Sequence, residues 1–415
     1  MKNVFFKKLN DTQAVTVLVL VKTGSRYEND KNRGVAHFIE HLLFKGTKKR
    51  PNSLSITKEL DGIGAEYNAF TTKDKTGYYI KASKENLELA LDILSDMLFH
   101  SKFDLREINR ERGVVLEEFN MYSDNPIMFL DDLLEASIFN KHSLGKLTLG
   151  EKEIIKNIKR DEILKFYKKY YKSENIIIGV AGNFSNDIEK IIKKYFKITN
   201  FNTKKTFDLF KSSQKELRLS CMNKDTDQIH VAIGFLSVSC FDKDFYSLKL
   251  LSIILGANMS SRLFIRMREE LGLCYYIRSS SDNYEDTGAF SITAGLDKNK
   301  IENAISNIFL EIEKIKTKKV SQEELKRAKE FLKGKLVLKM EDSENVVDWH
   351  CERLLFYNKD MSIEEMISNF NKVNSNDIIK IANKIFKKNK INIAIIGPEE
   401  TKQKISNIIK KLKSS

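Results

Sequence analysis

Residues 34–44 read Gly-Val-Ala-His-Phe-Ile-Glu-His-Leu-Leu-Phe, and the interpretation of the other segments depends on this stretch. Helix positions i, i+3 and i+4 share one face, so His37, Glu40 and His41 project together if the stretch is helical. The other faces carry an apolar stripe of Val35, Phe38, Ile39 and Leu42. Buried polar groups need partners. A zinc ion bound by both imidazoles, with a water that the carboxylate deprotonates, would satisfy all three.

The spacing H-x-x-E-H is a zinc-peptidase signature, but a surface His-Glu-His patch has the same spacing, so a third ligand matters. We predict a second helix over 104–122, bounded by an acidic capping-box start and a Ser-Asp-Asn-Pro stop. Glu107, Glu111 and Glu118 form one stripe on it, whereas Glu117 is rotated by about 100°. We assign Glu118 as the metal ligand and Glu111 as its supporting partner. A solvated acidic face is the alternative, and Glu117 becomes the ligand if the register is off by one.

These stretches resemble the insulinase or pitrilysin family of zinc peptidases, in the two-domain subgroup that includes mitochondrial processing peptidase. Three segments carry the resemblance: residues 34–47, Gly-Ala-Glu-Tyr-Asn-Ala-Phe-Thr at 64–71, and Glu-Arg-Gly-Val-Val-Leu-Glu-Glu at 111–118. With the segments of the second half described below, the resemblance extends over nearly the whole chain.

The resemblance implies one Zn²⁺ per chain, bound by His37, His41 and Glu118. It makes Glu40 the general base and matches Glu111 to the second glutamate of the family motif. His41 and Glu118 are 77 positions apart (118 − 41), which fits the usual gap in the family.

The resemblance also implies how a peptide binds. Arg268 and Tyr275 match a substrate-binding arginine and tyrosine seven residues apart in the second half of the family fold. Without the resemblance, an ordinary amphipathic helix that ends at Gly272 would explain them. Asn68 and Ala69 match the substrate-edge segment, where the peptide pairs as an added β-strand through main-chain hydrogen bonds.

An internal repeat sets the predicted fold class. Residues 161–184 and 377–398 each read as a helix followed by a buried strand that ends in glycine, at a spacing of about 215 residues. We therefore expect an α+β protein of two copies of one unit, and the resemblance implies that these are two homologous α/β-sandwich domains, each a mixed, mostly antiparallel sheet packed with helices. The predicted ranges are 1–200 for the catalytic zinc-binding domain, 201–215 for a linker, and 216–415 for a second domain without the zinc motif.

Family members with four such units form a clam-shell around a chamber, so the resemblance implies that this two-unit chain is half of a clam-shell. We therefore expect a dimer. The zinc motif and the Arg268–Tyr275 pair occur in one chain, which favours a homodimer. A heterodimer with a related subunit is the alternative.

Composition fits a folded protein with more than one domain. The 415 residues are 41% hydrophobic and 31% charged, and only 3 prolines and 18 glycines leave little room for linkers. No apolar run reaches the roughly 18 residues of a membrane span, and the N-terminus is too short in its apolar part for a secretory signal. The four cysteines lack C-x-x-C spacing, so we expect buried thiols without disulfides in a reducing compartment, in the simplest case a bacterial cytoplasm.

The formal charge of +14 raises the possibility of nucleic-acid binding. The lysines, however, are spread along predicted helix faces, and the nearest basic cluster is 45–50. We therefore predict no nucleic-acid partner and no membrane span.

The sequence predicts a zinc-dependent endopeptidase whose partner is a peptide substrate. The first alternative is a catalytically silent structural or assembly subunit of the same family, and the second is a basic nucleic-acid-binding protein. His230 and His350 stand alone in apolar surroundings, which is typical of core histidines. The natural substrate stays open between general oligopeptide clearance and a dedicated maturation step.

Overall fold

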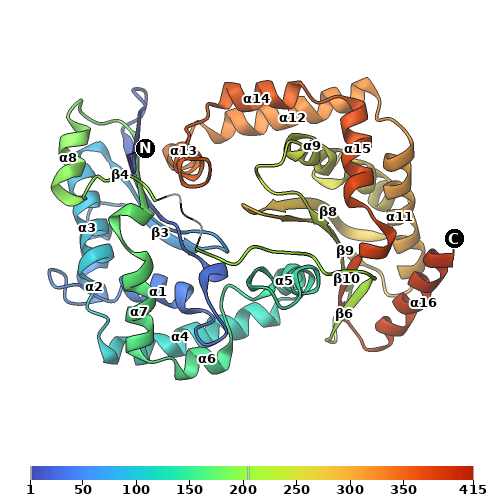
Figure 1. The fold of residues 1–415 in the computed structure, drawn as a ribbon, viewed down its shortest axis with the longest axis horizontal. Helices are drawn as coiled ribbons and strands as arrows, with labels where there is room; N and C mark the ends of the chain where they lie inside the picture. Colours follow the sequence, from blue (N-terminus) through green and yellow to red (C-terminus); the bar gives the residue numbers. More distant parts are fainter. Residues whose placement is uncertain (1, 203, 205, 415) are drawn as a thin grey trace. The chain divides into compact units, whose positions relative to one another are not determined.

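The computed structural model describes residues 2–202, 204 and 206–414, which form two compact units (Figure 1). Unit 1 takes its described residues from Met1–Met121, Lys146–Asp208 and Leu336–Ser362. Unit 2 takes its described residues from Tyr122–Gly145, Leu209–Lys335 and Ile363–Ser415. Each unit contains one five-stranded sheet with helices packed against it.

The two sheets have the same topology. The first has the order β1-β5-β2-β4-β3 and consists of β1 (Val4–Lys8), β2 (Ala14–Val21), β3 (Glu66–Thr71), β4 (Thr76–Ser83) and β5 (Ile176–Gly182). The second has the order β6-β10-β7-β9-β8 and consists of β6 (Arg218–Asn223), β7 (Ile229–Ser237), β8 (Cys274–Asn283), β9 (Gly288–Leu296) and β10 (Asn392–Gly397). Pairing is antiparallel except for β1 with β5 and β6 with β10. The predicted fold class of two homologous α/β sandwiches is confirmed.

Strand β2 shows why the first sheet is covered on both faces. Its side chains alternate, as the pleat of a strand requires. Val15, Val17, Val19 and Val21 enter one core cluster, whereas Leu18 and Leu20 enter another. The first cluster lies under α1 (Val35–Leu43), α3 (Leu87–His100), α7 (Arg160–Tyr170) and α8 (Ile188–Tyr195). The second lies under α13 (Ser343–Tyr357), on the opposite face of the sheet (Figure 1).

The helices that cover the second faces are exchanged between the two halves of the sequence. Helix α5 (Pro126–Phe139) packs on β7 and β10 of unit 2, and α13 packs on β2 and β5 of unit 1. Two glycines make room for them. A Cβ at Gly179 would lie 2.2 Å from Cys351 Sγ of α13, and one at Gly234 would lie 2.8 Å from Leu134 and Ile138 of α5.

The compact units therefore differ from two contiguous halves. Each sheet has two apolar faces, and the helix that buries the second face comes from the other half of the chain. The assignment of 1–200 and 216–415 as repeated domains stays a prediction. The predicted linker, 201–215, includes residues 203 and 205, which lie outside the described residues.

The remaining α-helices complete the layers of each unit. In unit 2, α9 and α15 lie on the sheet and α11 packs on α15. The bounds of the remaining helices are α2 (Ser53–Asp61), α4 (Leu105–Asp124), α6 (Lys152–Asn157), α9 (Phe245–Gly256), α10 (Arg262–Phe264), α11 (Ile301–Thr317), α12 (Gln322–Lys339), α14 (Ile363–Asn371), α15 (Ser375–Ile385) and α16 (Glu400–Ser414). Over the described residues, none of the helices has the length and apolar character that crossing a membrane requires.

Two minor expectations can be compared with the structure. His230 is buried and shares a 2.9 Å hydrogen bond with the Tyr276 hydroxyl, as expected for a core histidine. The four cysteines, all within the described part, form no disulfide. The expectation that all four are buried is wrong, because Cys221 is exposed on β6, an edge strand of the second sheet, and only Cys351 is fully buried.

Candidate metal centre

The helix that carries the H-x-x-E-H motif, α1, has a fixed start. Gly34 caps it with a positive φ of 90°, and a Cβ there would lie 2.5 Å from the Leu149 carbonyl oxygen, so only glycine fits. The buried carboxylate of Glu28 accepts hydrogen bonds from the backbone N–H groups of Gly34 and Ala36, both at 2.8 Å. These bonds satisfy two of the N–H groups that a helix start leaves open. The position of the motif along α1 is therefore set from its first turn.

Three side chains converge beside α1. Nε2 of His37 and Nε2 of His41 are 3.3 Å apart, and Glu118 Oε2 on α4 lies 3.7 Å from the first and 3.4 Å from the second. Zinc–ligand bonds of about 2.0–2.2 Å in a tetrahedral site put ligand atoms roughly 3.3–3.5 Å apart. The three donors fit that geometry. Across the described residues, this is the one group of histidine, cysteine or carboxylate side chains close enough to hold a metal.

The structure separates the two adjacent glutamates of α4. Glu118 points into the site, whereas Glu117 is exposed on another side of the helix. Glu111 and Glu118 of the predicted stripe therefore lie on the face of α4 that turns toward His37 and His41, with Glu111 buried and Glu118 half-buried.

A second layer of contacts fixes His41. Its Nδ1 lies 2.8 Å from Glu111 Oε1, and Lys45 Nζ lies 2.7 Å from Glu111 Oε2. Burial acts against the charge of Glu111, but hydrogen bonds from His41 and Lys45 hold its pKa below the ordinary value. With Nδ1–H directed at Glu111, the lone pair of His41 Nε2 remains for a metal.

The surroundings shift the pKa values of the two imidazoles in opposite directions. Burial and the neighbouring His41 lower the pKa of His37 to about 4. Burial also acts to lower the pKa of His41, but Glu111 and Glu118 outweigh it and raise that pKa to about 9. His41 therefore binds a proton more readily than His37 does.

Glu40 lies in the same pocket and has a different environment. Burial raises its pKa, while a hydrogen bond from Thr71 and the charge of His41 oppose the rise. Thr71 Oγ1 donates that bond to Glu40 Oε2 at 2.6 Å. A carboxylate whose pKa is raised is a stronger base than an ordinary glutamate, which suits it to accept a proton.

The pocket opens onto the free edge of a sheet. It has a volume of about 450 Å³ and is lined by His37, Glu40, His41, Phe44, Lys45, Tyr67, Asn68, Ala69, Glu111 and Glu118. Asn68 and Ala69 belong to β3, which is the last strand of the first sheet. An edge strand has main-chain groups that no neighbouring strand occupies. The structure thus brings the predicted substrate-edge residues to the predicted metal site.

Arg268 and Tyr275 lie in unit 2, next to one another. Arg268 is on a π-helical turn, Ile265–Glu270, and its Nη1 donates to the Tyr275 carbonyl oxygen at 2.8 Å. A β-bulge between Cys274 and Tyr276 leaves Tyr275 outside the ladder, with its side chain 70% exposed. π-turns and bulges are frequent at functional sites because they redirect side chains. The segment is a short helical stretch with Leu263 and Met267 buried, followed by Gly272 at a positive φ of 56°, so the role of Arg268 and Tyr275 in substrate binding stays a prediction.

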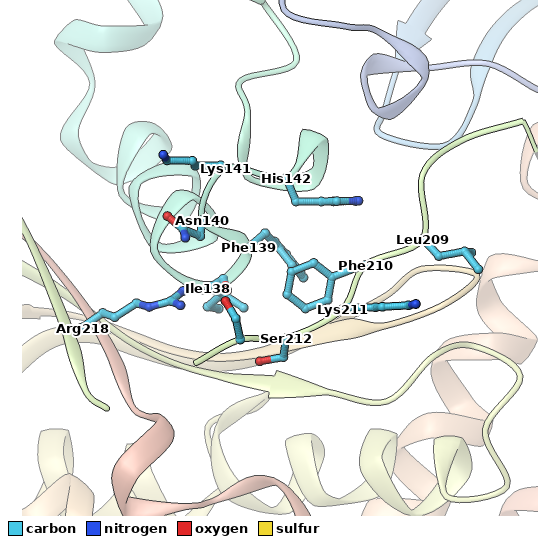
Figure 2. Close-up of a pocket in the computed structure, with 11 residues that line it drawn as sticks. Ile138, Phe139, Asn140, Lys141, His142, Leu209, Phe210, Lys211, Ser212 and Arg218 are labelled. Carbon is cyan, nitrogen blue, oxygen red and sulfur yellow. Dashed lines mark hydrogen bonds between the residues drawn. The ribbon is translucent and has the colours of Figure 1, made fainter. Parts of the chain in front are cut away.

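A second pocket, of about 320 Å³, lies in unit 2 at the end of α5 (Figure 2). The rings of Phe139 and Phe210 meet there edge to face, with centroids 5.2 Å apart. Arg218 donates to the carbonyl oxygens of Ser137 and Ile138 at 2.6 and 3.3 Å. These contacts anchor the last turn of α5. The residues that could hold a metal lie in the pocket beside β3, so we interpret this second pocket as a feature of packing.

Three residues of the site escaped prediction from the sequence. Glu28 contacts the start of α1, Thr71 contacts Glu40, and Lys45 contacts Glu111, and folding is needed to bring each pair together. The basic run at 45–50 drew attention to Lys45 as surface charge, and the matched segment 64–71 contained Thr71 without a role. An acidic residue shortly before a glycine-capped helix was the available signal for Glu28.

Family models match most of the chain. A model described as insulinase (peptidase family M16) matches residues 3–152, and one described as peptidase M16 inactive domain matches residues 157–332. The chain is 34% identical over 386 residues to the uncharacterized zinc protease YmxG of Bacillus subtilis, with 93% of each chain covered. It is 35% identical over 386 residues to an uncharacterized zinc protease of Rickettsia bellii, with 93% of this chain and 92% of the relative covered.

Solved structures agree with these matches. A protease from Helicobacter pylori superimposes with a TM-score of 0.89 at 28% identity, covering 95% of this chain and 96% of that one. A Pseudomonas fluorescens structure described as a peptidase M16 inactive domain superimposes with a TM-score of 0.84 at 20% identity, covering 95% of both chains, and supports the fold alone.

Proposed function

Because this chain belongs to the insulinase family of peptidases, family M16, we propose that it is a zinc-dependent endopeptidase that hydrolyses peptides or unfolded polypeptide segments. One observation carries the proposal: the ligand atoms of His37, His41 and Glu118 lie within 4.8 Å of one another, with Glu40 in the same pocket. One Zn²⁺ per chain is proposed, in line with the one such group of donors found among the residues that the structure describes.

The histidines and carboxylates of the pocket are proposed to have different roles. When bound, the zinc ion would lower the pKa of a water toward about 7 and polarise the scissile carbonyl. His37, His41 and Glu118 would hold the ion, and Glu111 would keep His41 in the tautomer that presents Nε2. Glu40 accepts a proton from the attacking water at its carboxylate and passes it to the amine that leaves.

The substrate is proposed to bind as an added strand on β3. Its main chain pairs with the open edge at Asn68 and Ala69, which puts a peptide bond beside the pocket. Backbone pairing tolerates many sequences, so length and ease of unfolding select the substrate. We further propose a homodimer in the bacterial cytoplasm that encloses a chamber, with Arg268 and Tyr275 as substrate-binding residues.

The test compares Glu40→Gln with wild type and with Glu117→Gln, the same substitution at an exposed neighbour on α4. Loss of a general base slows catalysis by about 10² to 10⁴. We expect Glu40→Gln to bind zinc normally and to be nearly inactive on a fluorescence-quenched peptide, while Glu117→Gln matches wild type. A chelator should abolish wild-type cleavage and zinc should restore it.

The outcomes separate the alternatives. A Glu40→Gln protein with more than about a tenth of wild-type activity would show that Glu40 is not the base. A wild-type protein that binds zinc but cleaves no member of a peptide library would instead support a silent structural or assembly subunit.

A further inference from the structure

The hydroxyl of Thr71 has a contact that the proposed mechanism does not use. Its Oγ1 donates to Glu40 Oε2 at 2.6 Å, across 31 positions of sequence. Among the described residues, it is the hydrogen-bond donor to the carboxylate of Glu40. A glutamate side chain has several rotatable bonds and loses conformational freedom only where a contact holds it.

The donor itself is held rigidly. Thr71 is the last residue of β3 and pairs with Thr76 of β4. The turn that follows closes with a 2.8 Å bond from the Thr72 N–H to the Lys75 carbonyl oxygen. Threonine is β-branched, so its χ1 has few accessible rotamers on a strand. The strand therefore fixes the direction from which Oε2 of Glu40 is held.

The geometry assigns Thr71 as a positioning residue for Glu40. One carboxylate oxygen, Oε2, is anchored by the hydroxyl, and the other, Oε1, keeps its capacity to accept a proton. This inference rests on the proposed function, because it gives Glu40 the role of base.

The anchor has a consequence for the substrate. Asn68 and Ala69, where the peptide is proposed to pair, lie on the same strand as Thr71. One short strand would then set both the position of the scissile carbonyl and the position of the base. Small misplacements of reacting groups are costly, by about 10² for roughly 1 Å.

The test uses three threonine variants of the full chain. Thr71→Val keeps the shape of the side chain and removes the donor, whereas Thr71→Ser keeps the donor. Thr76→Val is the matched control, because Thr76 lies directly opposite on β4 and its Oγ1 donates to the Thr23 carbonyl oxygen instead. For each variant we would measure kcat, KM, zinc affinity by competition with a chromophoric chelator, and thermal unfolding.

We expect Thr71→Val to lower kcat about tenfold or more, less than loss of the base itself, and to leave KM and zinc affinity within about twofold. Thr71→Ser should recover most of kcat. Thr76→Val should lower the unfolding temperature and retain kcat. A Thr71→Val enzyme with wild-type kcat, or an equal fall in Thr76→Val, would overturn the assignment.

A crystal structure of zinc-loaded Thr71→Val beside that of wild type tests the assignment without any activity. We expect the Glu40 carboxylate to leave its wild-type position. If it stays, the assignment is wrong whatever the rates are. If it moves while wild type cleaves no peptide, the positioning contact stands and the proposed function fails.

Discussion

Three carboxylates share the pocket, and their surroundings give them different properties. A hydrogen bond from His41 lowers the pKa of Glu118, and bonds from His41 and Lys45 outweigh burial to lower that of Glu111. Burial raises the pKa of Glu40 instead. Different surroundings can give neighbouring carboxyl groups different pKa values. In this way one carboxylate can bind a metal while another accepts a proton.

A fourth carboxylate, Glu28, makes folding stability depend on pH. Burial raises its pKa from 4.5 to about 8, although bonds from the Gly34 and Ala36 N–H groups and the charge of Arg33 oppose the rise. The folded state then holds the proton more tightly than the unfolded state. The resulting stability is full below pH 4.5 and is lost as pH rises through about 8.

The measurement is the free energy of unfolding of the metal-free protein between pH 5 and about 9, for wild type and Glu28→Gln. We expect the advantage of wild type over the variant to shrink as pH rises, because the variant has no group to titrate at this position. Parallel curves for the two proteins would show that Glu28 is ionised in the folded state throughout.

At the scale of elements, local periodicity was enough to identify part of the site. The motif residues lie within one helix, so helix geometry alone predicts that they share a face. The same geometry puts Glu118, and not Glu117, in line with Glu111 on α4. The hairpin of β3 and β4 is equally local, because the two strands pair across a short turn. None of these required knowledge of which elements meet.

Contacts between distant segments were not predictable in the same way. Thr71 meets Glu40 only because β3 lies beside α1, and Lys45 reaches Glu111 only because α4 packs there. Likewise, the apolar faces of α5 and α13 show that these helices are buried but not against which sheet. A pattern of hydrophobic residues predicts that one face of a helix is buried, but it does not predict which sheet or helix covers that face.

Helix α13 packs so closely on β5 that a side chain at Gly179 should destabilise the protein. A Cβ at this position would lie 2.2 Å from Cys351 Sγ and 2.4 Å from Val347, so Gly179→Ala forces helix and sheet apart. We expect a loss of about 1–3 kcal/mol in unfolding free energy, as for other overpacked cores. Gly334→Ala is the control, because a Cβ there meets nothing within 4 Å and alanine favours the helix interior by about 1 kcal/mol. If Gly179→Ala is as stable as wild type in chemical denaturation, α13 does not pack on the sheet as described.

At the scale of the whole molecule, the chain contains both the candidate metal centre and the Arg268–Tyr275 pair. A homodimer whose subunits complete each other's sites would require both. We expect a His37→Ala chain and an Arg268→Ala chain to be separately inactive, and their mixture to regain about a quarter to half of wild-type activity after subunit exchange, by the symmetry of a dimer.

Subunit exchange has to be shown independently, for example with differently tagged chains. With exchange established, an inactive mixture would mean that Arg268 serves the metal centre of its own chain, or none. The oligomeric state by light scattering would then decide whether a dimer exists at all.

In the proposed site, two ring nitrogens and one carboxylate oxygen meet at one divalent cation. Anomalous X-ray diffraction at the zinc edge, on crystals of the zinc-loaded protein, tests it most directly. We predict one strong peak per chain, about 2.0–2.2 Å from Nε2 of His37, Nε2 of His41 and an oxygen of Glu118. A peak elsewhere, or none at this site in a protein that cleaves peptides, would contradict the account.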